Sequence, residues 1–205
     1  RHTDRKTLEI FAMVTAGRIN TLLVERLQQM GVNAIGLSGV DGRLLEGKRK
    51  AALRIVENGK RKVLRGDYSG KIERVNVTLL KTLLAAGYVP VVAPLAISYE
   101  GEALNVDGDR VAAAISGALK AQTLVILTNV PGLLEKFPDE NTVIAHVLPE
   151  NAPTLLDQVA QGRMKKKMLG VVEAVNDGVQ KAVIADGRVN RPLQRALAGQ
   201  GTVIG

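Results

Sequence analysis

The stretch ALNVDGDRVAAAISGALKAQTLVILTNVPG, residues 103–132, contains the alternation of elements that predicts the fold. After a polar turn, Asp109 or Asn105 is expected to open an Ala-rich helix that runs to about Leu119. An acidic or amide side chain at that place accepts hydrogen bonds from free backbone N–H groups. The apolar run TLVILT that follows is typical of a strand buried on both faces, and Pro131-Gly132 predicts the turn after it.

Short apolar runs and helical spacings alternate along the rest of the chain. A helical pattern extends from Thr3 to Gly31 with a bend expected at Gly17, and a second helix is expected to stop at Gly87. Strands alternating with helices predict an α/β fold with a mostly parallel central sheet and helices on both faces. Three further runs are each predicted to form one strand: VNAIGLSG at 32–39, YVPVVAPLAIS at 88–98 and KAVIADG at 181–187.

Composition excludes several kinds of site. The chain has 205 residues and no cysteine, which rules out disulfides, thiolate zinc sites and cysteine nucleophiles and fits a reducing cytoplasm. The two histidines, His2 and His146, lie far apart in the sequence, which disfavours a His-rich metal site or a Ser/His/Asp triad. The stretch from Asp107 to Ala118 lacks the alternating oxygen ligands and the terminal glutamate of a calcium loop, and no protein-held metal is expected. The apolar runs are shorter than the roughly twenty residues of a membrane span.

Positive charge is concentrated in one segment. The net charge of the chain is +8, and residues 43–65 contain nine basic and two acidic residues. Asn58-Gly59 within that segment predicts a type I′ turn, so residues 43–66 are expected to form a basic hairpin. Such a surface suits an acidic partner or a merely solvated face. A nucleic-acid module is disfavoured because aromatic residues make up 2% of the chain and none interleaves with the basic run.

Six blocks occur in order along the chain: R-x-T-D at Arg1 to Asp4, GLSGVDG at 36–42, VPVVAP at 89–94, NVDGD at 105–109, LTNVPG at 127–132 and GRMKKK at 162–167. Together they resemble the amino acid kinase family and specifically its acetylglutamate kinase branch. Asp107-Gly108 stands where acetylglutamate kinases have Asn-Ala, and the basic hairpin exceeds what a free acetylated amino acid requires. In both respects the chain is most similar to the carrier-dependent aminoadipate and glutamate kinases of that branch.

The resemblance implies a carbamate-kinase-like three-layer sandwich. It implies a partial N-terminal lobe, residues 1–100, that binds substrate and carrier, and a nucleotide-binding lobe, residues 101–205. The implied reaction is transfer of the γ-phosphoryl group of ATP, with Mg2+, to a side-chain carboxylate in cytoplasmic lysine or arginine biosynthesis. Because a carboxylate is already anionic at neutral pH, catalysis reduces to positioning and charge neutralisation.

The resemblance also implies roles for individual residues. Arg1 matches the arginine that grips the substrate α-carboxylate, and Asn105 matches the asparagine that binds its amide-linked portion. Asp109 matches the carboxylate that organises the active-site lysines. Lys167, on a helix where three successive lysines point in different directions, matches the lysine on the transferring phosphoryl group. Nucleotide contacts are implied for Thr128, Asn129, Val130, Gly132, Leu133, Met164 and Lys167, with Mg2+ bridging the phosphates rather than sitting in a protein cage.

Partners follow from the same likeness. The carriers of this group are small acidic proteins of the LysW type, and a homodimer through the N-terminal lobe is expected, without nucleic acid or membrane. Two alternatives stay open: an acetylglutamate kinase of arginine biosynthesis, and a non-catalytic relative that binds a nucleotide or amino acid. Aminoadipate and glutamate differ by one methylene, worth only about 1–3 kcal/mol in a pocket. Carrier contacts are expected at Arg43, Lys48, Arg49, Lys50 and Arg54.

The family pattern extends upstream of the R-x-T-D motif. It places there an N-terminal strand with a second catalytic lysine and two Gly-rich turns. Since this chain begins at Arg1, we expect it to be N-terminally incomplete: either the upstream segment lies outside this sequence, or the protein is a truncated relative. In the second case we expect little or no kinase activity.

Overall fold

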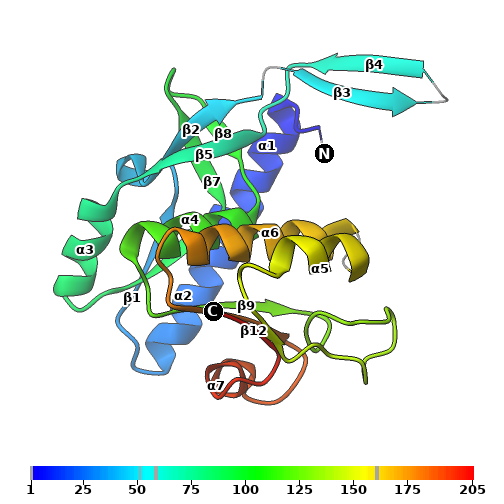
Figure 1. The fold of residues 1–205 in the computed structure, drawn as a ribbon. Helices are drawn as coiled ribbons and strands as arrows, with labels where there is room; N and C mark the ends of the chain where they lie inside the picture. Colours follow the sequence, from blue (N-terminus) through cyan, green and yellow to red (C-terminus); the bar gives the residue numbers. More distant parts are fainter. Residues whose placement is uncertain (1, 51, 58–59, 160–161) are drawn as a thin grey trace. The chain divides into compact units, whose positions relative to one another are not determined.

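The computed structural model describes residues 2–50, 52–57, 60–159 and 162–205 (Figure 1). The chain divides into two compact units, Arg1–Val111 and Ala112–Gly205. The boundary therefore falls inside helix α4 (Gly108–Leu119), whereas the sequence suggested lobes that meet before it, at residues 100 and 101.

Unit 1 begins with a long helical stretch formed by α1 (Arg5–Ala12), the π-helical η1 (Met13–Ile19) and α2 (Asn20–Gln29). Asp4, rather than Thr3, caps it by accepting a hydrogen bond from the Thr7 N–H at 2.7 Å. Gly17 lies in the π-helical segment, and Gly31, with a φ of 78°, follows the helix end as predicted.

This stretch packs on a two-stranded parallel sheet of β1 (Ala34–Ser38) and β6 (Val89–Ala93). The Asn20 amide donates to the carbonyl oxygens of Leu37, at 3.3 Å, and Val91, at 2.8 Å. Gly36 permits this approach, because a Cβ there would lie 2.1 Å from Asn20 Oδ1. By length and composition alone, Arg5–Gln29 is also apolar enough to cross a membrane, yet Asn20 ties its middle to the sheet of its own unit.

A second sheet of unit 1 has the strand order β5-β2-β7-β8. Its strands are β2 (Leu45–Arg49), β5 (Gly70–Val75), β7 (Leu95–Ser98) and β8 (Ala103–Asn105). The run at 88–98, predicted as one strand, is divided between β6 and β7 in different sheets. Pro94 separates the two strands, since it has no N–H to continue a ladder. Helix α3 (Val77–Ala85) is capped by Asn76, which accepts from the Leu79 N–H.

The predicted hairpin is present but shorter than expected. Strands β3 (Ala52–Glu57) and β4 (Lys60–Arg65) pair antiparallel with Glu57 opposite Lys60, and the turn at Asn58-Gly59 lies outside the described residues. Residues 43–49 do not belong to this hairpin. Arg43 ends a short 3-10 turn (Asp41–Arg43), and Lys48 and Arg49 lie in β2, which pairs with β5 and β7 instead.

Unit 2 is a helix–sheet–helix arrangement (Figure 1). Its sheet has the order β10-β12-β11-β9, in which β9 and β11 are parallel, and β11 and β12 antiparallel. Helices α4, α5 and α6 cover one face, and α7 covers the other. The two cores reflect the alternation along β11, because Ile184 belongs to the cluster with Met168 whereas Val183 belongs to the cluster with Ala196.

These elements confirm the predicted α/β class with helices on both faces of a mostly parallel sheet. The bounds in unit 2 are β9 (Thr123–Thr128), β10 (His146–Val147), α5 (Ala152–Val159), α6 (Gly162–Asn176), β11 (Lys181–Asp186), α7 (Pro192–Leu197) and β12 (Thr202–Ile204).

Candidate functional site

The N-terminal motif is anchored within unit 1 at Thr3. Its backbone N–H donates to Asp67 Oδ1 at 2.9 Å, and its carbonyl accepts from the Tyr68 N–H at 2.7 Å. Its hydroxyl accepts from Asn105 Nδ2 at 3.1 Å, across 102 positions of sequence. Arg1 lies outside the described residues. The fold therefore brings the predicted substrate residue Asn105 into contact with Thr3 of the R-x-T-D motif.

Asp67 holds this junction together and was not predicted from the sequence. Its side chain is fully buried and accepts from the Ser69 N–H at 3.0 Å and the Ser69 hydroxyl at 2.7 Å, besides Thr3. Burial by itself would raise the pKa of Asp67, but the hydrogen bonds from Ser69 and Thr3 outweigh it and lower the pKa below its usual range. The Asp-x-Ser spacing signals a local turn, but nothing local signals the contact with Thr3.

Asp107, and not the predicted Asp109 or Asn105, caps the start of α4. Asp107 Oδ1 accepts from the N–H groups of Asp109, at 3.0 Å, and Arg110, at 3.3 Å, so Asp107 is the capping residue. Neither Asp109 nor Asn105 caps the helix: Asp109 lies in its first turn and Asn105 ends β8. The Asp109 carboxylate is half-buried and is not the group that closes the helix end.

The three successive lysines of α6 are unequal, as their directions on a helix require. Lys166 is exposed, whereas Lys165 and Lys167 are half-buried. Met164 packs against the core of unit 2, which also contains the fully buried Met168. The predicted phosphoryl-binding residue Lys167 is thus one of two partly covered lysines beside a rigid core.

The carboxyl ends of β9 and β11 lie at the same edge of the unit 2 sheet. Thr128 and Asp186 are partners in the parallel register, and the Gly187 N–H donates to the Thr128 carbonyl at 2.7 Å. A Cβ at Gly187 would lie 3.2 Å from that carbonyl, so the absent side chain permits the contact. The predicted nucleotide-binding loop therefore starts from a fixed point.

The same loop is also fixed at its other end. The Leu133 N–H donates to Thr202 Oγ1 at 2.7 Å, and the Leu133 side chain is buried. Gly132 is packed against that hydroxyl, since a Cβ there would lie 2.6 Å from it. Between the fixed ends, Asn129 is exposed and Val130 half-buried. The loop 128–133 is thus a short connection with its polar tip in solvent.

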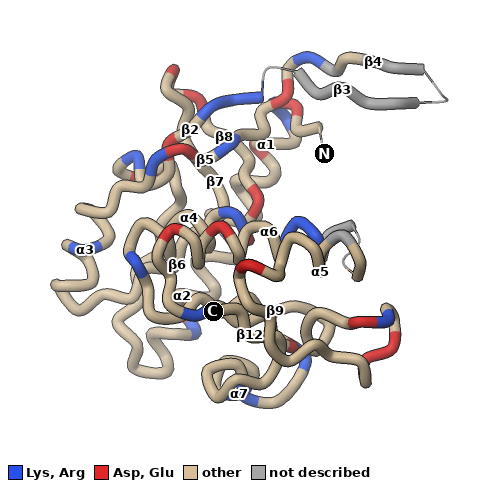
Figure 2. Tube along the Cα trace, in the orientation of Figure 1, with Lys and Arg blue, Asp and Glu red and all other residues tan. Residues whose placement is uncertain are grey.

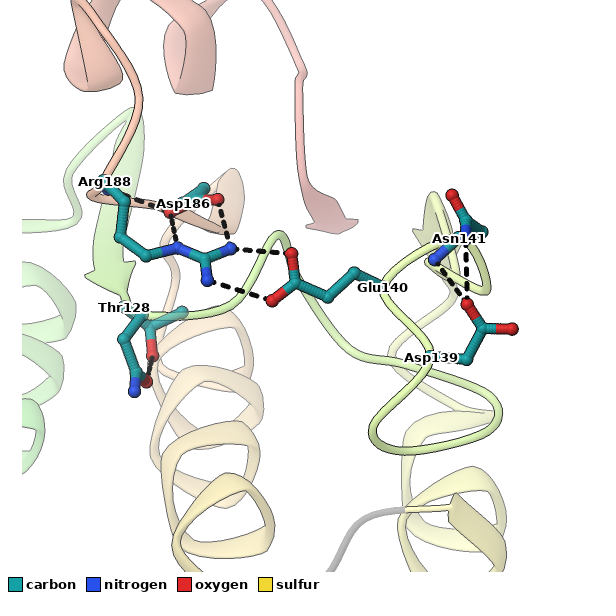
Figure 3. A network of polar contacts seen from close by, with 7 residues as sticks. Thr128, Asp139, Glu140, Asn141, Asp186 and Arg188 are labelled. Atoms are coloured by element: carbon teal, nitrogen blue, oxygen red, sulfur yellow. Dashed lines mark hydrogen bonds and ion pairs between the residues drawn. The ribbon is translucent and has the colours of Figure 1, made fainter.

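Arg188 forms a charged network beside this loop (Figure 3). It donates to both carboxylate oxygens of Asp186, at 2.8 and 2.7 Å, and to both oxygens of Glu140, at 2.9 and 2.8 Å. The Arg188 hydrogen bond is the main reason why the pKa of Asp186 is lowered. The strand end at Asp186-Gly187 was expected from the sequence, but Arg188 and Glu140 were not, because their contact spans 48 positions.

The predicted carrier-binding residues already have partners inside unit 1 in three cases. Arg43 donates to the Glu46 carboxylate and, at 3.1 Å, to the Ser98 carbonyl. Lys48 pairs with Glu73 at 3.3 Å, and both β2 and β5 carry basic as well as acidic residues (Figure 2). Lys50 is exposed, and the side chain of Arg54 lies outside the described residues.

Among these residues, Arg49 makes contacts with three different groups of unit 1. Its guanidinium stacks 3.8 Å from the centre of the Tyr68 ring, and its Nη1 donates to Glu102 at 2.8 Å. Its Nε donates to the Asp67 carbonyl at 2.9 Å. The hydrogen bond to Glu102 raises the pKa of Arg49 further above its usual range. Arg49 thus braces the strand pair beside the Thr3 junction.

Among the described residues, no three His, Asp or Glu side chains gather in a way that could hold a metal ion. The site residues in hand are amides, hydroxyls, carboxylates and lysines. Such groups can orient a carboxylate substrate and neutralise phosphate charge, and a site of this kind has no need of a general base.

The sequence profile of the amino acid kinase family matches residues 1–186. The chain is 56% identical over 206 residues to a LysW-aminoadipate kinase of Thermus thermophilus, with all of this chain aligned to 76% of that protein. It is 56% identical over 204 residues to a LysW-aminoadipate kinase of Deinococcus radiodurans, with all of this chain aligned to 70% of that protein. An acetylglutamate kinase of Methanopyrus kandleri is 43% identical over 205 residues, 100% of this chain and 79% of that protein.

Solved structures agree on the fold. The N-acetylglutamate synthase of Neisseria gonorrhoeae superposes with a TM-score of 0.82 at 26% identity, covering 100% of this chain and 45% of that one. A carbamate kinase of Giardia lamblia has a TM-score of 0.64 at 14% identity, covering 95% of this chain and 72% of that one. The carbamate-kinase-like fold expected from the sequence is confirmed.

Replacing Asp67 is expected to destabilise the protein in proportion to the hydrogen bonds lost. Asp67→Ala removes the carboxylate oxygens that accept hydrogen bonds from Thr3 and Ser69. We therefore expect the free energy of unfolding to fall by about 2–4 kcal/mol. Asp67→Asn keeps one carbonyl acceptor and offers Ser69 a donor, so we expect a fall of about 1 kcal/mol. Urea unfolding measures both values.

The pH dependence of the free energy of unfolding separates the contribution of the Asp67 charge from that of its shape. Because the folded-state pKa of Asp67 is lowered, the charge stabilises the fold above the unfolded-state pKa, and this contribution is lost as pH falls through the folded-state pKa. The difference between wild type and Asp67→Asn should shrink over that acidic window. Glu25→Gln, at an exposed carboxylate on α2, is the matched control with little effect. Equal losses in both Asp67 variants at every pH would contradict the assignment.

Proposed function

This chain belongs to the amino acid kinase family, and we propose that it serves the ATP-dependent phosphorylation of a carrier-linked aminoadipate or glutamate. The product is an acyl phosphate on the side-chain carboxylate, in lysine or arginine biosynthesis in the cytoplasm. The observation that carries the proposal is the 56% identity, over the whole chain, to two LysW-aminoadipate kinases. Identity to the acetylglutamate kinase of Methanopyrus kandleri is lower, at 43%.

In this proposal the two units divide the work. Unit 1 binds the amino acid through Arg1 and Asn105, and the Thr3 junction supports it by holding Asn105 beside the R-x-T-D motif. The Asn105 side chain carries both a donor and an acceptor, which suits an amide-linked substrate. A planar guanidinium such as that of Arg1 suits the planar α-carboxylate.

Unit 2 binds ATP in the proposal, and bound ATP supplies the transferred phosphoryl group. The loop 128–133 stands at the carboxyl edge of parallel strands, where α/β folds bind ligands. Asn129 and Thr128 offer polar groups there, and Met164 lies on α6 together with Lys167. Lys167 neutralises charge on the phosphoryl oxygens, and Asp109, in unit 1, takes the catalytic role that the family resemblance implies. Mg2+, bound together with ATP, would neutralise charge on the phosphates.

A second candidate is phosphorylation of free N-acetylglutamate, which the likeness to acetylglutamate kinases supports. The same groups would serve, because both substrates present an α-carboxylate, an amide and a side-chain carboxylate. The two candidates differ in what lies beyond the amide: a protein carrier in one case and a methyl group in the other.

The substrate is tested by ATP-dependent hydroxamate formation in the gene product that contains this chain. We expect a higher kcat/KM with carrier-linked aminoadipate or glutamate than with free N-acetylglutamate, because only the former engages the carrier surface. Equal or better activity on N-acetylglutamate would favour the second candidate.

Variants of α6 provide the control for catalysis. Lys167→Met should lower kcat by about 10²–10³-fold, since a charge aimed at the transition state is lost. Lys166→Met, at the exposed neighbour, should leave kcat nearly unchanged. If wild type binds ATP in titration calorimetry but phosphorylates none of these acceptors, the chain belongs to a non-catalytic relative.

An acidic carrier protein is proposed to dock on the basic face of unit 1 that includes the exposed Lys48 and Lys50. Arg49 is better kept out of the test because it braces Tyr68 and Glu102. Lys50→Glu is expected to raise the KM for the carrier-linked substrate several-fold at low salt and to leave the KM for ATP unchanged. Salt should reduce the difference, since exposed charges are screened. Lys81→Glu, an exposed charge reversal on α3, is the matched control, and an equal effect there would refute this docking face.

A homodimer is proposed through the apolar stripe on α1, η1 and α2. Asn20 directs one side of this helix onto β1 and β6, while large apolar side chains elsewhere on it are 43–71% exposed. Exposed large apolar side chains in this number on one helical stretch are typical of an interface. Leu23→Glu should convert a dimer to a monomer in analytical ultracentrifugation, and Gln29→Glu should not. A monomeric wild type would refute the proposal. The stripe consists of Ile10, Met13, Val14, Ile19, Leu22, Leu23 and Met30.

A further inference from the structure

The chain between β9 and β10 folds back on itself at residues 133–144. Leu134 and Val143 form an antiparallel bridge, and the Glu135 N–H donates to the Thr142 carbonyl at 2.8 Å. The Ile144 N–H donates to the Leu133 carbonyl at 2.8 Å. This 133–144 segment is therefore a hairpin-like unit whose base begins where the loop 128–133 ends.

Two hydrogen-bonded contacts attach the 133–144 segment to the rest of unit 2, in addition to the packing of Leu133 and Ile144 in the core. At the base, the Leu133 N–H reaches Thr202 of β12. Toward the tip, both carboxylate oxygens of Glu140 accept from Arg188, which follows β11 (Figure 3). Paired forks of this kind fix the relative orientation of the two groups as well as their distance. Glu140 is thus the residue of the 133–144 segment that Arg188 binds.

Arg188 is itself held in place by the strand it follows. Its Nε and Nη2 donate to Asp186, and its backbone N–H donates to Asp186 Oδ1 at 2.8 Å. Gly187, between them, donates to the Thr128 carbonyl. Residues 186–188 therefore contact both the start of the loop 128–133 and the tip of the segment that continues it.

We propose that Arg188 is a positioning residue that fastens the 133–144 segment to the end of β11 and thereby holds the loop 128–133 in shape for ATP. This inference rests on the proposed nucleotide site in unit 2. Arg188 acts through Glu140 and the loop, without touching the reacting groups. The strands themselves do not depend on it, because β9 and β11 share a full ladder above a buried core.

Charge and positioning predict opposite changes in ATP affinity for Glu140→Gln. Arg188 contributes one positive charge against the two negative charges of Asp186 and Glu140. Glu140→Gln removes a negative charge near the proposed phosphate site, which by charge alone would tighten ATP binding. It also breaks the charged fork to Arg188, which by positioning would weaken ATP binding. The sign of the change in ATP affinity therefore separates the two accounts.

The test measures ATP affinity by titration calorimetry, and both KM values by kinetics, in the gene product that contains this chain. Arg188→Ala and Glu140→Gln should each raise the Kd for ATP about three- to tenfold. The double variant should be no worse than Arg188→Ala, because both changes break one contact. Arg188→Lys should recover part of the affinity. The KM for the amino acid substrate should not change.

Matched controls are Glu135→Gln, on the same segment, and Arg195→Ala, on α7, both at exposed side chains. Neither should alter ATP affinity. Hydrogen exchange should accelerate in residues 133–144 of Arg188→Ala and remain unchanged in β9 and β11. Tighter ATP binding by Glu140→Gln, additive effects of the two changes, or a parallel rise of both KM values would overturn the inference.

The calorimetric measurement keeps this inference separate from the proposed substrate. If wild type binds ATP but forms no acyl phosphate, the proposed function fails, while the affinities of the variants still decide the role of Arg188. If acyl phosphate forms and Arg188→Ala binds ATP as wild type does, the inference fails and the proposed function stands.

Discussion

Parallel pairing of strands is the constraint on which the arrangement of both units depends. A parallel pair requires a crossover, and each crossover here contains helices: α3 lies between β1 and β6, and α5 and α6 lie between β9 and β11. The carboxyl ends of paired strands then meet at one edge. Loops leaving that edge are brought together irrespective of their distance in sequence, which is how Thr128 comes to lie beside Asp186 and Gly187.

Several carboxylates hold neighbouring backbone and side-chain groups in place by hydrogen bonds, although the net charge of the chain is positive. Asp67 organises Thr3 and Ser69, Asp107 closes the start of α4, and Asp186 orients Arg188. Glu46, nearly buried, accepts from Arg74 and Arg43. Several basic side chains are therefore engaged inside their own unit, and the total of 28 lysines and arginines overstates the number of cations left for a partner, although pairing leaves the net charge at +8.

The sequence was sufficient for features that depend on local patterns. Apolar runs predicted the strands near 34–38, 123–128 and 181–186, and Asn58-Gly59 predicted the pairing of β3 with β4. Features decided by distant contacts were missed or misplaced. Pro94 divides what reads as one strand, because its halves find partners in two different sheets.

The site shows the same division. The motifs identified Asn105, Asp109 and Lys167 as candidates, but their local signals did not reveal that Asp107 caps α4. Asp67 and Arg188 carry no motif of their own. Each was found only when the fold joined residues many positions apart, such as Thr3 with Asp67.

The fold does not explain why Asp107-Gly108 stands where acetylglutamate kinases have Asn-Ala. Asparagine caps a helix about as well as aspartate, so the Asn found at this place in acetylglutamate kinases would leave α4 intact. A Cβ at Gly108 would meet only the Pro94 Cβ at 4.0 Å, an ordinary contact, so alanine would fit as well. Neither difference is therefore required by the fold, and the substitution leaves only a change of charge on an exposed side chain. The assignment to the carrier-dependent group then rests on identity spread along the whole chain, 56% against 43%, rather than on this turn.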